Sequence, residues 1–105
     1  MKATVANWLN DQFGGEAEVI AAIWSEYLAG TEEKIGECDA ALAVPDYPLL
    51  DRIAHTLKGN GLMVGNEEAA KAAIALRDAS KVGDHAGCAA AIERIKSVFA
   101  ADKVS

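Results

Sequence analysis

The stretch LDRIAHTLKGNGLMVG, residues 50–65, decides how this chain folds. Apolar and small residues recur in it at intervals of three and four, the spacing that places side chains on one face of an α-helix. The polar residues between them fall on the opposite face. The pattern predicts a helix over about residues 47–64 with an inward face made of Leu50, Ile53, Ala54, Leu57, Gly61 and Val64.

The same periodicity on either side of this stretch predicts helices over about residues 4–13, 16–43, 67–81 and 85–101. No strand-like alternation rich in Val, Ile and Thr occurs. Short connections make successive helices run antiparallel. We therefore predict an all-α fold: an antiparallel up-down-up-down four-helix bundle with an additional short N-terminal helix, in a single domain over residues 1–105.

Cap residues mark the predicted helix ends. Asp46, Asn66 and Asp84 each precede a helical pattern, and their short side-chain oxygens suit the N-cap position. Gly65 and Gly83 suit the left-handed position that follows a helix. The predicted inward residues are Ala69, Ala72, Ala73, Leu76 and Ala79 in the fourth helix, and Cys88, Ala91, Ile92, Ile95, Val98 and Phe99 in the last.

His55 lies outside the inward face of its helix and shares its own face with Asp51, Arg52, Lys58 and Gly59, three and four residues away. We expect an exposed imidazole beside two cations. Neutral imidazole is a nucleophile near neutral pH, and a lysine can balance the charge of a phosphoryl group. Glycine inside a helix costs about 0.5–1 kcal/mol relative to alanine, so Gly59 indicates a need for open access to His55.

The motif AHTLKG at residues 54–59, followed by Gly65, resembles the signature of histidine-containing phosphotransfer (HPt) domains of multistep phosphorelays. The resemblance covers nearly the whole chain. It includes the short first helix, the long second helix, the D-x-x-x-L-x-x-I-A-H approach to the motif and the turn at Gly83-Asp84.

The resemblance implies that His55 accepts a phosphoryl group from the receiver-domain aspartate of a hybrid histidine kinase. His55 would then pass the group to the aspartate of a response regulator. Lys58 would stabilise the phosphoryl group, Gly59 would keep the site open and Gly65 would allow the turn into the next helix. The chain would be a phosphocarrier rather than an enzyme, with no cofactor of its own, because the receiver supplies Mg²⁺ and the aspartyl chemistry.

One position departs from the family pattern. Many members carry Glu or Gln on the next helix within reach of the imidazole Nδ1, and the matching position here is Arg77. A guanidinium only donates hydrogen bonds, so a backbone group or water orients the ring, or the ring is freer. Arg77 is then a hypothetical phosphoryl ligand. Arg52 is a further candidate binding residue, with a surface ion pair to Asp51 or a bundle glutamate as its alternative role.

A receiver has to cover His55, so we expect it to contact the outer faces of the second and third helices. Leu62 lies on or near that face, and Lys58 lies at its rim. The N-terminal helix is expected to add apolar contact through Trp8 or Leu9. The interface should be modest in area, because a carrier must release its partner.

Other functions are weaker alternatives. A helical bundle that docks receivers without phosphotransfer would not need the intact set of His55, Lys58 and Gly59. A di-iron or haem bundle needs paired Glu-x-x-His or C-x-x-C-H motifs, and the sequence has neither. A histidine-dependent hydrolase would need a second acid/base group. His85, at the start of the last helix, is expected to be an ordinary exposed turn residue.

Composition limits the partners. The net charge of −6 disfavours binding to nucleic acid or anionic membranes, and no apolar run is long enough to span a bilayer. We expect a cytoplasmic monomer with protein partners. Cys38 and Cys88 lie in helical patterns without C-x-x-C spacing, which predicts buried free thiols in a reducing compartment.

Overall fold

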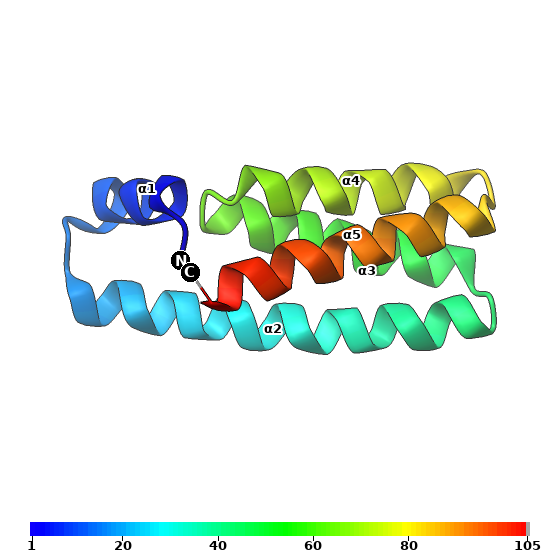
Figure 1. Cartoon of the computed structure of the whole chain (residues 1–105), viewed down its shortest axis with the longest axis horizontal. Coiled ribbons are helices and arrows are strands. Elements are labelled where there is room, and N and C mark those ends of the chain that lie inside the picture. The colour runs from blue at the N-terminus through cyan, green and yellow to red at the C-terminus, as the bar shows by residue number, and fades with distance from the viewer. Residues whose placement is uncertain (105) are drawn as a thin grey trace.

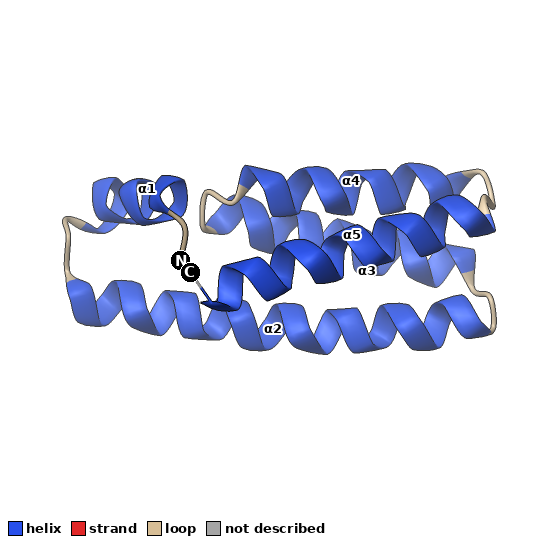
Figure 2. Cartoon of the chain, viewed as in Figure 1, coloured by secondary structure: helices blue, strands red, loops and turns tan. Residues whose placement is uncertain are grey.

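Five α-helices make up most of the computed structural model, which describes residues 1–104 (Figure 1). No strand occurs in this part of the chain, and the connections are short (Figure 2). The four longer helices run antiparallel in succession, which confirms the predicted bundle with its additional N-terminal helix. The helices are α1 (Ala3–Phe13), α2 (Ala17–Ala43), α3 (Tyr47–Met63), α4 (Glu67–Lys81) and α5 (His85–Val104).

The long helix α2 sets the length of the molecule, whose long axis measures 43 Å. Its 27 residues span about 40 Å at 1.5 Å per residue. The helices α3, α4 and α5 pack along its C-terminal part, and α1 folds back over its N-terminal part (Figure 1). The N-terminus and the end of α5 therefore lie close together. None of the described helices is both long and apolar enough to cross a membrane.

Buried side chains form two adjoining clusters. The larger fills the space between α2, α3, α4 and α5. The six residues predicted to face inward over residues 47–64 are all buried, with Val64 lying just after the end of α3. Burying one Leu or Ile side chain contributes about 1.5–3 kcal/mol, so this face holds α3 firmly in the bundle. The smaller cluster joins α1 to the N-terminal half of α2 and consists of Val5, Leu9, Ile20, Trp24, Tyr27 and Val64.

The buried face of α4 is rotated relative to the prediction. Ala70 and Ser80 are buried, whereas Ala69 and Ala79, which were predicted to face inward, are only half-buried. A helix face made mostly of alanine carries a weak periodic signal. Burial of Ser80 is possible because its hydroxyl donates to the carbonyl of Leu76, which satisfies the polar group inside the helix.

The last helix follows the prediction but continues past Ala101 to Val104. Its six predicted inward residues are buried. The extra turn carries Asp102, whose exposed fraction is only 2%. A buried carboxylate in this turn was not foreseen and requires polar partners.

A buried polar network at this end of the bundle supplies those partners. Asn66 is the N-cap of α4, and its Oδ1 accepts from the Ala69 N–H. Its Nδ2 donates to the Tyr27 hydroxyl at 3.1 Å and to the Asp102 carboxylate at 2.8 Å. The Lys2 ammonium lies 3.3 Å from the other Asp102 oxygen. The network therefore connects the chain start, α2, α4 and α5 through hydrogen bonds and an ion pair between buried polar groups.

The other predicted caps are confirmed. Asp46 accepts from the backbone N–H of Leu49 at the start of α3. Asp84 accepts from the N–H of Gly87 at the start of α5. Gly83, just before it, has a φ of +65°, as predicted for the residue that reverses the chain after α4.

Gly65 has a φ of +68° and turns the chain from α3 into α4. The indole of Trp8 lies directly against it. A Cβ at residue 65 would come within 2.6 Å of Trp8 Cδ2 and 2.8 Å of Trp8 Cβ. The glycine is therefore required by the backbone conformation and by the close packing of α1.

We expect Gly65→Ala to destabilise the protein more than Gly14→Ala. Both glycines have a left-handed φ, so both substitutions cost about 1–2 kcal/mol in backbone strain. Only residue 65 has Trp8 in the way, and overpacking adds about 1–3 kcal/mol. Urea unfolding of the two variants measures the difference. Equal losses would show that α1 shifts away without cost.

Candidate functional site

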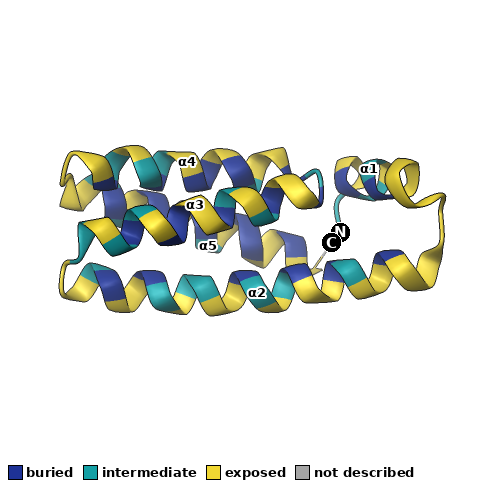
Figure 3. Ribbon diagram, turned by 180° about the vertical axis from the view of Figure 1, so that it is seen from behind, coloured by how far each residue is buried: buried dark blue, intermediate teal, exposed yellow. Residues whose placement is uncertain are grey.

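His55 lies in the middle of α3 on the face that points away from the core. Its neighbours Ile53, Ala54 and Leu57 are buried, whereas His55 is exposed, as predicted. Figure 3 shows how buried and exposed residues alternate along α3 in this way. The ring makes no hydrogen bond to any of residues 1–104. The imidazole is thus accessible to a partner and is held by no side chain of this part of the chain.

Two cations on α3 flank His55. Arg52 is exposed and Lys58 is half-buried. Neither forms an ion pair with a described residue. The surface ion pair considered for Arg52 is therefore not formed within residues 1–104. Asp51 is paired with Arg77 instead.

Arg77 reaches from α4 to α3 one helical turn before His55. Its Nε donates to Asp51 Oδ1 at 3.2 Å, and both side chains are about 30% exposed. A pair this exposed contributes about 1 kcal/mol or less to stability. Its larger effect is local: Asp51 and Arg77 compensate one another. The uncompensated charges on the face around His55 are then the positive charges of Arg52 and Lys58.

The glycines of α3 have different surroundings. A Cβ on Gly61 would approach the Ala70 nitrogen at 3.1 Å and the Asn66 oxygen at 3.2 Å, so Gly61 allows α3 and α4 to come close together. A Cβ on Gly59 would meet nothing within 4 Å. Nothing inside the protein requires a glycine at residue 59. Its place one turn from His55 is consistent with a surface kept bare for an incoming group.

An apolar surface continues from this face. Leu62 is 50% exposed and Met63 is 73% exposed. Beside them a groove of about 360 Å³ lies between α2 and the end of α3 and reaches Phe13 of α1. The contribution of Met63 and the groove was not predicted. The consecutive apolar pair Leu62-Met63 before a glycine turn was the available signal, since one helix face cannot bury both.

The expected contribution of α1 needs correction. Leu9 is fully buried in the smaller cluster and cannot touch a partner. Trp8 is half-buried, with its ring against Gly65. In α1, Phe13 is the residue that borders the groove. The sequence indicated that α1 has apolar residues but did not indicate how its apolar face is rotated toward α2.

Other potential nucleophiles are less available. Cys38 and Cys88 are free and buried, as predicted. Burial, with the nearby Asp39 and Glu37 charges, raises the pKa of the Cys38 thiol from 9.0 to about 12, and burial also raises the pKa of Cys88. His85 is exposed, and its Nδ1 lies 3.2 Å from the Tyr47 hydroxyl. The described residues contain no group of three or more metal-ligating side chains.

Comparison with known proteins assigns this arrangement to a family. The family model described as "Hpt domain" matches residues 22–102, which include α3, α4 and most of α2 and α5. No curated protein and no solved structure matched the chain. The matched segment includes every candidate site residue from Arg52 to Arg77.

Proposed function

Because this chain belongs to the Hpt domain family, whose domains act in histidine phosphotransfer of two-component phosphorelays, we propose that it is a phosphocarrier loaded on His55. The donor is the receiver-domain aspartyl phosphate of a hybrid histidine kinase. The acceptor is the receiver aspartate of a response regulator. The observation that carries the proposal is the exposed imidazole between two unpaired cations on a rigid helix.

The nucleophile of the transfer is the exposed imidazole of His55. The lone pair of the neutral imidazole forms a bond to phosphorus, and the bond between phosphorus and the donor carboxylate oxygen breaks. The electron pair of the broken bond stays on the aspartate. The ring keeps its other N–H, becomes cationic and loses that proton to water. Unloading onto the next receiver reverses these steps.

Lys58 and Arg52 support this chemistry through their charge. The phosphoryl group brings negative charge to the surface of a protein whose net charge is already −6. Nearby cations are needed to offset the repulsion between the phosphoryl group and the protein. Lys58 lies three residues from His55 and has no carboxylate partner within residues 1–104. We assign Lys58 to the phosphoryl group. Arg52 and the free Nη groups of Arg77 are secondary candidates.

Receiver docking fits the outer face formed by α2 and α3. Gly59 leaves room beside His55, and Leu62 and Met63 offer apolar contact. The groove beside them extends this surface toward α1. Central apolar contacts with charges at the rim suit an interface that forms and releases quickly.

The remaining parts of the proposal follow from this role. The chain acts as a monomer in the cytoplasm and needs no cofactor of its own, because Mg²⁺ belongs to the receiver. Neither nucleic acid nor membrane is a partner. The alternative function is a module that docks receivers without accepting a phosphoryl group. The two functions differ in whether His55 becomes phosphorylated.

Incubation with a phosphorylated receiver should place an acid-labile, base-stable phosphoryl group on the wild-type protein. His55→Gln should abolish labelling, because glutamine has no nucleophilic ring nitrogen. His85→Gln is the matched control and should be labelled like wild type. Receiver binding without label on wild type, with several competent donors, would instead support the docking module.

Lys58→Glu should lower the rate of phosphoryl transfer by about tenfold or more, because it replaces attraction for the phosphoryl group by repulsion. Lys71→Glu changes the net charge equally at an exposed position of α4 away from His55 and is the control. Rapid-quench kinetics measure both. Equal rates for wild type and Lys58→Glu would refute the role of Lys58.

In the same assay, an unchanged rate and phosphohistidine lifetime in Arg77→Ala would remove Arg77 from the site.

Leu62→Asp should weaken receiver binding about fivefold or more, because a charge replaces an apolar contact near the centre of the interface. Val44→Asp alters a valine that is 75% exposed and lies before the opposite end of α3, and this variant should bind normally. Calorimetric titration with the receiver measures the dissociation constants. Equal constants for both variants would place the docking surface elsewhere.

A further inference from the structure

The hydroxyl of Thr31 is an exception to the otherwise satisfied polar network. Thr31 is 5% exposed, and its Oγ1 is inaccessible to solvent and has no hydrogen-bond partner. An unpaired buried hydroxyl is costly, and such groups in folded proteins nearly always have a partner. The position of Thr31 in α2 therefore calls for a partner that the protein itself does not supply.

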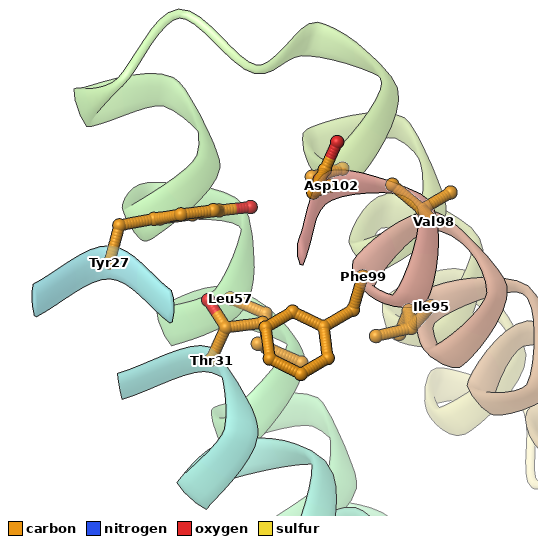
Figure 4. A pocket seen from close by; sticks show the side chains of 8 residues that line it. Tyr27, Thr31, Leu57, Ile95, Val98, Phe99 and Asp102 are labelled. Atoms are coloured by element: carbon orange, nitrogen blue, oxygen red, sulfur yellow. The ribbon is translucent and has the colours of Figure 1, made fainter. Parts of the chain in front are cut away.

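A small cavity adjoins this hydroxyl. Its volume is about 10 Å³, and the polar residues Tyr27, Thr31 and Asp102 line it together with apolar residues. Figure 4 shows Tyr27 and Thr31 extending from α2 toward Phe99 and Asp102 of α5. A volume of about 10–15 Å³ is the space that one water molecule needs, and a buried water needs two to four polar partners. The cavity is too small for a larger ligand.

Besides the Thr31 hydroxyl, the hydrogen bonds around the cavity leave one donor, on Tyr27, and one acceptor, on Asp102, unused. The Tyr27 oxygen accepts from Asn66 Nδ2. The Thr31 hydroxyl lies near enough to the phenol to act on its pKa, but the two groups are not in hydrogen-bonding geometry, so the phenol proton has no acceptor among the described residues. Burial and the Asp102 carboxylate raise the pKa of Tyr27 above 10.0, with the Thr31 and Asn66 side chains opposing them in part. The phenol therefore keeps its proton and remains a donor. Asp102 binds Asn66 and Lys2 and still has free lone pairs.

We propose that this cavity is a structural hydration site that holds one water molecule. The water accepts the Tyr27 hydroxyl proton and donates to Thr31 Oγ1 and to the Asp102 carboxylate. It makes the three hydrogen bonds that are usual for a buried water. The water adds to the Asn66 network and joins α2 to α5 in a cavity that Leu57 of α3 also lines.

Substitution of Thr31 by the isosteric valine tests the site, because the predicted change in the stability of the protein has opposite signs with and without the water. With the bridging water, Thr31→Val removes a hydrogen-bond partner and raises the unfolding equilibrium constant about fivefold. With a dry cavity, the same change removes an unpaired hydroxyl and stabilises the protein. Thr56→Val, at an exposed position of α3 where the hydroxyl donates to the Arg52 carbonyl, corrects for the change of residue type. Stability equal to or above wild type, after this correction, overturns the proposal.

The water itself can be observed in the wild-type protein. Oxygen-17 relaxation dispersion should count one long-lived water more in wild type and in Thr31→Ser, which keeps the hydroxyl, than in Thr31→Val. A high-resolution crystal structure should show the water within hydrogen-bond distance of Thr31 Oγ1 and Tyr27 Oη. A direct bond between these two oxygens without a water, or equal water counts, contradicts the proposal. These measurements do not depend on phosphotransfer.

Discussion

The packing of one face of α3 into the bundle is the constraint on which the rest of the structure depends. Because an α-helix turns about 100° per residue, burying Ile53, Ala54 and Leu57 places His55 on the outer face. Each large apolar side chain in that face contributes about 1.5–3 kcal/mol. The ring of His55 makes no hydrogen bond within residues 1–104. Its position is therefore set by its buried neighbours, which leaves its own chemistry free for a partner.

Three glycines at and after the end of α3 show how one residue type serves three physical purposes. Gly61 lets α3 and α4 approach closely, and Gly65 adopts a left-handed φ beneath the Trp8 ring. Gly59 has neither role and lies in open space next to His55. Two of these glycines are explained by the fold. The third has no role in the packing, and we propose that it keeps the surface beside His55 open for a partner.

Polar groups are arranged differently on the surface around His55 and in the buried network near the chain ends. Around His55, the ion pair of Asp51 with Arg77 leaves Arg52 and Lys58 without carboxylate partners within residues 1–104. On α3, the charges left without a carboxylate partner near His55 are therefore positive. Near the chain ends, buried polar groups are instead paired around Asn66, which acts both as the cap of α4 and as a bridge to α2 and α5. The first arrangement suits binding of an anion, whereas the second fixes the helices.

The sequence by itself determined the helices, their caps and the outward direction of His55, because helical periodicity and capping act between residues a few positions apart. Only the tertiary structure decided the ion pair of Asp51 with Arg77, the full burial of Leu9 and the buried carboxylate of Asp102. These features depend on how each helix is rotated about its axis and shifted along it. The alanine-rich face of α4 and the short α1 leave that rotation open until the helices pack against one another.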